Sequence, residues 1–115
     1  MAYIDGFVAA VSAANKDIYR EHAARMGAIM KRHGALRCVE TWGDDVPEGQ
    51  VTSFSRAVQR KDDEAVVFSW VWWPDKATRD GAWAQMMNDE EMKAEDMPFD
   101  GKRMIFGGFE VLVEA

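Results

Sequence analysis

The sequence has a single cysteine, Cys38, and no long apolar run. One cysteine cannot form an internal disulfide, and without a second thiol it cannot build a thiolate metal cluster, so no structural metal site is expected. The apolar runs are too short to span a bilayer. The first residues, MAYIDGFV, lack a basic stretch followed by a long apolar segment, so we expect no signal peptide and a cytoplasmic protein.

Positive charge is also scarce. The sequence contains 14 lysines and arginines and 20 aspartates and glutamates, which gives a formal net charge of −6. Such a chain repels a phosphate backbone unless its cations gather on one face, so neither a nucleic acid nor a membrane is expected as a partner. A chain of 115 residues fits one domain, residues 1–115.

The first half of the chain predicts a strand, a helix and a second strand. Residues 2–11 form a run that is rich in β-forming residues, and Asn15 is a candidate N-cap for a helix that continues to Lys31. Apolar residues recur in that helix every three or four positions, and Gly34 suits its C-terminal end. Residues 35–43 alternate as a second strand should.

The second half predicts the same kinds of element. Residues 51–59 and 65–73 both look strand-like, the first of them either as a separate strand or as an extension of the edge of the second strand. Asp75 can cap the next helix, an acidic helix follows that Pro98 stops, and residues 102–113 form the last strand.

The order β-α-β-(β)-β-α-β predicts an α+β domain of the ferredoxin-like class, an antiparallel sheet with both helices on one face. The other face should then alternate with polar residues if water covers it. In residues 66–73 both alternating sets are largely apolar, which leaves a large aromatic surface to cover. We therefore expect a symmetric homodimer in which two sheets pack face to face.

Four segments also resemble a known family: YIDGFV, ALRCVETWGDDVP, VVFSW and above all MPFDGKRMIFGGFE. Together they are similar to the YbaA-like proteins, a small bacterial family of unknown function in the dimeric α/β-barrel superfamily. The resemblance covers essentially the whole chain. It implies a ferredoxin-like dimer and supplies no reaction, although members of the wider superfamily include cofactor-independent monooxygenases and haem proteins.

Acidic residues interrupt otherwise apolar strands at Asp5, Glu40 and Glu110. A partly buried carboxylate with a raised pKa is a familiar general base, although strand acids more often form ion pairs or face solvent. Glu40 is the best catalytic candidate, because the apolar residues on its strand face would desolvate it. The predicted ligand-binding residues are Arg37, Trp42, Arg103, Gly107 and Gly108.

The adjacent glycines Gly107 and Gly108 weaken a strand unless something approaches its backbone. They indicate a bulge, a tight contact with an aromatic ring or, with less support, a bound ligand. His22 and His33 share the inward face of the first helix, where hydrogen-bonded core histidines are favoured over haem ligands. We expect no cofactor.

Three classes of function follow. The first is a small-molecule binder or cofactor-free enzyme with a cleft between helices and sheet, acting by proton abstraction or oxygenation, which predicts an enclosed pocket and a perturbed carboxylate. The second is a non-catalytic structural or interaction homodimer, which predicts a cleft filled by its own side chains. The third, RNA binding, would require a basic face. The first is favoured.

Overall fold

The computed structural model describes residues 1–115 and contains one antiparallel sheet of four strands in the order β2-β3-β1-β4. The strands are β1 (Tyr3–Ser12), β2 (Arg37–Glu40), β3 (Glu64–Trp73) and β4 (Ile105–Glu110). The helices are α1 (Lys16–Arg32), α2 (Phe54–Ala57), α3 (Lys76–Met86) and α4 (Glu90–Ala94), and a 3₁₀ turn at Ala13–Asn15 precedes α1. This confirms the α+β, ferredoxin-like prediction.

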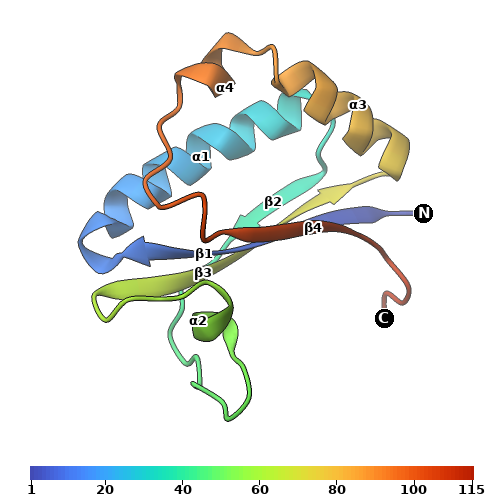
Figure 1. Cartoon of the computed structure of the whole chain (residues 1–115). Coiled ribbons are helices and arrows are strands. Elements are labelled where there is room, and N and C mark those ends of the chain that lie inside the picture. The colour runs from blue at the N-terminus through green and yellow to red at the C-terminus, as the bar shows by residue number, and fades with distance from the viewer.

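The helices lie on both sides of the sheet, but unequally. Figure 1 shows α1, α3 and α4 together on one side, with the short α2 and its loop on the other. We call the first side the helix face and the second the outer face. No helix combines the length and the hydropathy that a membrane crossing requires. The main apolar core lies between the helix face and the helices and contains Tyr3, Ile29, Met30, Ala35, Val71, Trp73, Ala82 and Met86.

The register of the sheet assigns each strand residue to a face. Tyr3 pairs with Trp73 on β3 and with Glu110 on β4, so residues two apart along each strand share a face with these partners. Both faces are apolar, as the alternation predicted. The outer face carries Phe68, Trp70, Trp72, Ile105 and Phe109, and of these Phe68, Ile105 and Phe109 are exposed.

The strand predicted for residues 51–59 is wrong. The segment forms α2, which begins where the Ser53 side chain accepts a hydrogen bond from the backbone N–H of Arg56. The guanidinium of Arg56 donates to the carbonyls of Gly49, Gln50 and Val51, which holds the preceding loop against the helix. Val58 is fully buried beside the outer face. Local capping and this one apolar anchor outweigh the β propensity of the segment.

Gly34 and Asp75 mark helix ends in the way that the sequence predicted. Gly34 has φ +113 and follows the last turn of α1, and the Asp75 side chain accepts from the backbone N–H of Thr78 at the start of α3. Asn15 occupies the N-cap position of α1 but makes no capping bond, because the chain enters the helix through the 3₁₀ turn.

Aromatic packing explains Gly108, whereas a Cβ at Gly107 would make only an ordinary van der Waals contact. A Cβ on Gly108 would lie 2.7 Å from Cε2 of Tyr3, so the ring of Tyr3 needs a residue without a side chain beneath it. A Cβ on Gly107 would meet the ring of Phe109 at 3.5 Å on the outer face. The β1–β4 ladder runs without interruption from Ile105 to Glu110, so there is no bulge at this pair.

Candidate functional site

A cleft of about 680 Å³ lies between the helix face of the sheet and the helices. Seventeen of its 25 lining residues are hydrophobic, among them Phe7, Met26, Met92 and Phe106. Both the volume and the lining are typical of small-molecule sites. The chain from α4 to β4 closes one side, because Glu95, Met97, Phe99 and Met104 line the cleft as well. We call residues 95–104 the strap.

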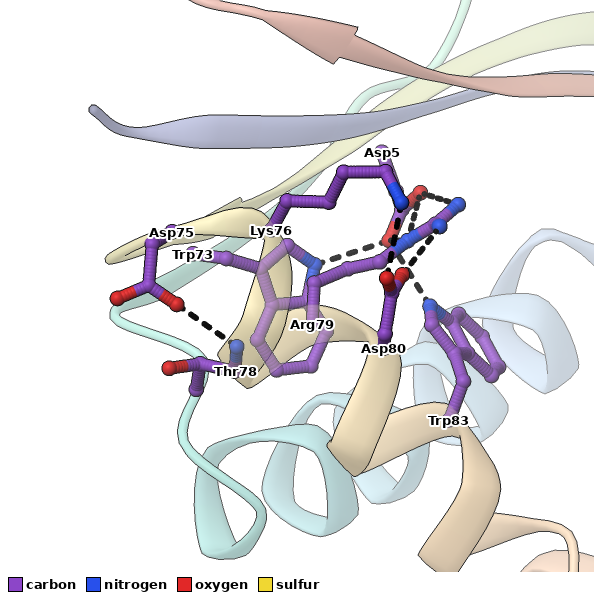
Figure 2. A network of polar contacts seen from close by, with 8 residues as sticks. All are labelled: Asp5, Trp73, Asp75, Lys76, Thr78, Arg79, Asp80 and Trp83. Atoms are coloured by element: carbon purple, nitrogen blue, oxygen red, sulfur yellow. Dashed lines mark hydrogen bonds and ion pairs between the residues drawn. The ribbon is translucent and has the colours of Figure 1, made fainter.

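One wall of the cleft is organised around the buried carboxylate of Asp5 (Figure 2). The indole N–H groups of Trp73 and Trp83 each donate to its Oδ2 at 2.9 Å. Arg79 on α3 donates to Oδ1 through Nε at 3.0 Å and Nη2 at 2.7 Å. A buried carboxylate is stable only when it is paired and hydrogen-bonded in this way. Because its acceptor sites are filled, Asp5 has a structural role here.

Glu40 occupies another part of the wall and has a different environment. Its Oε2 accepts a hydrogen bond from the hydroxyl of Tyr19 at 2.9 Å, which joins the end of β2 to α1. Partial burial raises the pKa of Glu40 above its usual value, although the Tyr19 hydrogen bond acts in the opposite direction. Burial and the nearby Glu40 carboxylate also raise the pKa of Tyr19. Part of the Glu40 side chain is open to solvent, so the carboxylate lies at the margin of the cleft.

Three rings gather beside this carboxylate. The ring centroids of Tyr19 and Phe99 are 6.0 Å apart, and that of His22 lies 6.4 Å from Tyr19 and 6.3 Å from Phe99. His22 is buried, and its Nδ1 lies 3.1 Å from a carboxylate oxygen of Glu95 on the strap. Both histidines are hydrogen-bonded, as expected, since His33 contacts Gln85 and Asp89. The structure contains no group of three or more metal-ligating side chains.

Ion pairs hold the strap at both ends. At its start, Glu95 accepts from Arg25 on α1, with Nη2 at 3.2 Å from Oε2, and the hydrogen bonding to Arg25 lowers the pKa of Glu95 to about 2. At its end, both terminal nitrogens of Arg103 donate to Glu64, at 2.8 and 2.7 Å. This bidentate pair lowers the pKa of Glu64 to about 2. The closure of the cleft therefore depends on two carboxylates that are charged at neutral pH.

Acid should weaken both anchors of the strap. Each carboxylate has a folded-state pKa of about 2 against an ordinary value of 4.5, so its contribution to stability is complete above about pH 4.5 and is lost as the pH falls towards 2. We expect the unfolding temperature to fall over this window, and to fall less steeply in the double variant Glu64→Gln/Glu95→Gln. The exposed Glu90→Gln is the control. Thermal unfolding at a series of pH values measures this. The prediction is contradicted if, below pH 4.5, the unfolding temperature falls as steeply with pH in the double variant as in wild type.

The structure brings two of the predicted site residues together. Glu40 lines the cleft, and it also lines a second groove of about 530 Å³ between α1 and the end of β2. Trp42 lines that groove, with its ring centroid 6.2 Å from that of Tyr19. The ammonium group of Lys16 lies over the Trp42 indole, 5.4 Å from its centroid. Glu40 therefore separates an apolar cleft from a groove that carries basic residues.

The other predicted site residues lie outside the cleft lining. Arg37 is exposed and pairs with Trp72, whose side chain belongs to the outer face. Arg103 anchors the strap through Glu64, Gly108 accommodates the ring of Tyr3, and Gly107 lies on the outer face beside Phe109. None of these four residues contacts the Tyr19–Glu40 pair.

Sequence reasoning did not select several residues that build the site. Tyr19 and His22 had a detectable signal, because they lie three positions apart on the predicted inward face of the first helix. Glu95 and Phe99 had none, since they belong to a stretch that has no periodicity. Asp5 was considered only as a strand acid, and its partners come from β3 and α3.

Comparison with known proteins identifies the family. The family model described as "Protein of unknown function (DUF1428)" matches residues 2–101. The chain belongs to this family. It is also 54% identical to the uncharacterised protein YbaA of Escherichia coli K12, over 99% of both chains, and to YbaA of Shigella flexneri to the same extent. The resemblance seen in the sequence is confirmed.

Solved structures extend the DUF1428 fold to more distant proteins. A dimeric ferredoxin-like protein from an uncultured marine organism superposes with a TM-score of 0.60 over 99% of this chain and 98% of its own, at 9% identity. SnoaB, a cofactor-independent oxygenase from Streptomyces nogalater, superposes with a TM-score of 0.53 over 98% and 93%, at 18% identity. At such identities the likeness shows the fold alone.

Proposed function

We propose that this protein binds a small apolar or aromatic molecule in the cleft between helices and sheet. The observation that carries the proposal is the cleft itself, with about 680 Å³ of space and a mostly hydrophobic lining. The alternative, a structural homodimer without a ligand, predicts that the chain's own side chains fill this space. The open volume therefore favours binding.

Glu40 is the group that would act on such a ligand. A carboxylate with a raised pKa is a stronger base, and Tyr19 holds it in a defined orientation at the margin of the cleft. It would accept a proton from an acidic C–H group without a cofactor. Dioxygen would then add to the resulting carbanion with a new C–O bond, and the return of the proton from Glu40 would give a hydroperoxide. The oxygenase activity of SnoaB, which has the same fold, supports this class of reaction by analogy.

Binding can be measured with N-phenyl-1-naphthylamine, an uncharged fluorescent probe. We expect its emission to rise and saturate at one probe per chain. The variant Ala23→Phe places a ring in the cleft, because Ala23 on α1 is part of its lining, and should weaken binding by about tenfold or more. Ala24→Phe adds the same ring at the neighbouring exposed position and should bind the probe as wild type does.

Two results would overturn the cleft as the binding site. One is the absence of saturable binding to the wild-type protein. The other is equal affinity of all three proteins, which would place the probe on the exposed aromatic rings of the outer face.

The outer face supports a homodimer as the working form. Phe109 is 61% exposed, Ile105 is 45% exposed and Phe68 is 43% exposed, and they form one apolar surface with Trp70 and Trp72. Exposed aromatic surface of this kind marks an interaction site. A second copy covers it symmetrically, and the dimeric ferredoxin-like neighbour supports this arrangement.

A further inference from the structure

The carboxylates that line the cleft differ in whether they form an ion pair with an arginine. Asp5, Glu40, Asp80 and Glu95 line it, whereas Arg79 is its only lysine or arginine. Arg79 is paired with Asp5 at 2.7 Å and with Asp80 at 3.0 Å. Glu95 is paired with Arg25, which lies outside the lining. Arg79 and Arg25 therefore already have carboxylate partners.

Glu40 is the acid that remains without a cation. It forms no ion pair, and the side chains that hydrogen-bond to it are the uncharged hydroxyls of Tyr19 and Ser69. The basic residues of the second groove, Lys16, Arg20 and Lys31, form no ion pair with it. Arg20 is paired with Asp17. The cleft thus offers one uncompensated hydrogen-bond acceptor and no free positive charge.

The rings beside Glu40 complete a recognition pattern. Tyr19, His22 and Phe99 lie within 6.4 Å of one another next to the carboxylate. The faces of aromatic rings attract cations, and a carboxylate among them strengthens that attraction. Trp42, on the other side of Glu40, already has the ammonium group of Lys16 over its ring. The three inner rings have no such partner.

We propose that the ligand is a compact aromatic amine, with its ring in the apolar cleft and its protonated nitrogen paired with Glu40. An anionic ligand would find no free cation in the cleft, and an uncharged ligand would leave Glu40 without a counter-charge. Because Glu40 lies partly open to solvent at the margin, the ammonium group keeps part of its hydration while the ring is buried. This inference rests on the proposed function and specifies its ligand class.

Three probes of similar shape test the charge: 2-phenylethylamine, 2-phenylethanol and 3-phenylpropanoate. Each is titrated at pH 7 against protein loaded with N-phenyl-1-naphthylamine, and its affinity is read from displacement. We expect the amine to bind at least about tenfold more tightly than the alcohol, because a hydrogen bond to an ionised partner is roughly twice as strong as a neutral one. The propanoate should bind most weakly.

Substitution separates recognition by Glu40 from general apolar binding. Glu40→Gln should remove most of the preference for the amine while the affinity for the alcohol stays within about twofold. Glu110→Gln makes the same change at an exposed acid that does not line the cleft, and should keep the preference. Circular dichroism of both variants checks that the fold is retained.

The outcomes distinguish the two proposals. If the uncharged probe binds and the amine shows no advantage over the other two compounds, or keeps its advantage in Glu40→Gln, the amine inference is overturned and the apolar cleft site stands. If neither the uncharged probe nor the amine binds, both proposals are overturned.

Discussion

Replacement of Asp5 by asparagine should lower the free energy of unfolding by about 3 kcal/mol, because it leaves Arg79 without its buried counter-ion. The carboxylate accepts from Trp73, Trp83 and Arg79 at once, so no other single polar group joins β1, β3 and α3 in this way. Asparagine preserves the volume but removes the charge and one acceptor oxygen. Chemical denaturation, with the slope checked for two-state behaviour, measures the change.

Asp80→Asn is the matched control for this prediction. Asp80 also contacts Arg79, at 3.0 Å, but it is exposed to solvent and sits on the surface of α3. Solvent screens such a pair, so the midpoint of denaturation should hardly change. If the two variants unfold at the same denaturant concentration, the Asp5 network does not have the structural role that its geometry indicates.

Phe109→Glu should convert the proposed homodimer into a monomer. The substitution places a charge in the middle of the outer face, where the partner sheet would bury it, and truncates an aromatic residue of the kind that dominates interfaces. We expect the dissociation constant of the dimer to rise about 100-fold or more. Sedimentation velocity over a range of protein concentrations measures this shift directly.

Phe106, three residues before Phe109 on β4, provides the control. Phe106 is 71% exposed and lies on the same strand, but it points to the helix face and lines the cleft. Phe106→Glu should leave the dimer intact. A wild-type protein that sediments as a monomer at tens of micromolar would refute the dimer, and equal dissociation of both variants would show that the outer face is not the interface.

The fold could be read from the sequence because its signals are local or periodic. The alternation along residues 66–73 assigned each side chain to the face on which the structure places it. Asp75 and Gly34 marked helix ends, since capping bonds and left-handed backbone involve residues a few positions apart. Residues 51–59 show the limit of such reasoning, because a serine cap and one buried valine turned a strand-like pattern into a helix.

The candidate site was only partly visible in the sequence. Glu40 was selected from its position in an apolar strand, and the structure places it at the cleft. Its partner Tyr19 is 21 residues away in the chain, and their contact depends on how α1 lies across the sheet. Arg37 and Arg103 were predicted to bind a ligand, but the pleat directs Arg37 to the outer face and Glu64 holds Arg103 at the end of the strap.

Outside residues 51–59, the sequence by itself determined the order of strands and helices. It also determined the two apolar faces of the sheet and the family, because these follow from periodicity, capping and residue-by-residue likeness. Only the tertiary structure decided which charges neutralise one another and which acid is left without a cation. The physical reason is distance. Ion pairs and hydrogen bonds act over a few ångströms in space, between side chains that here lie as many as 78 residues apart in the chain.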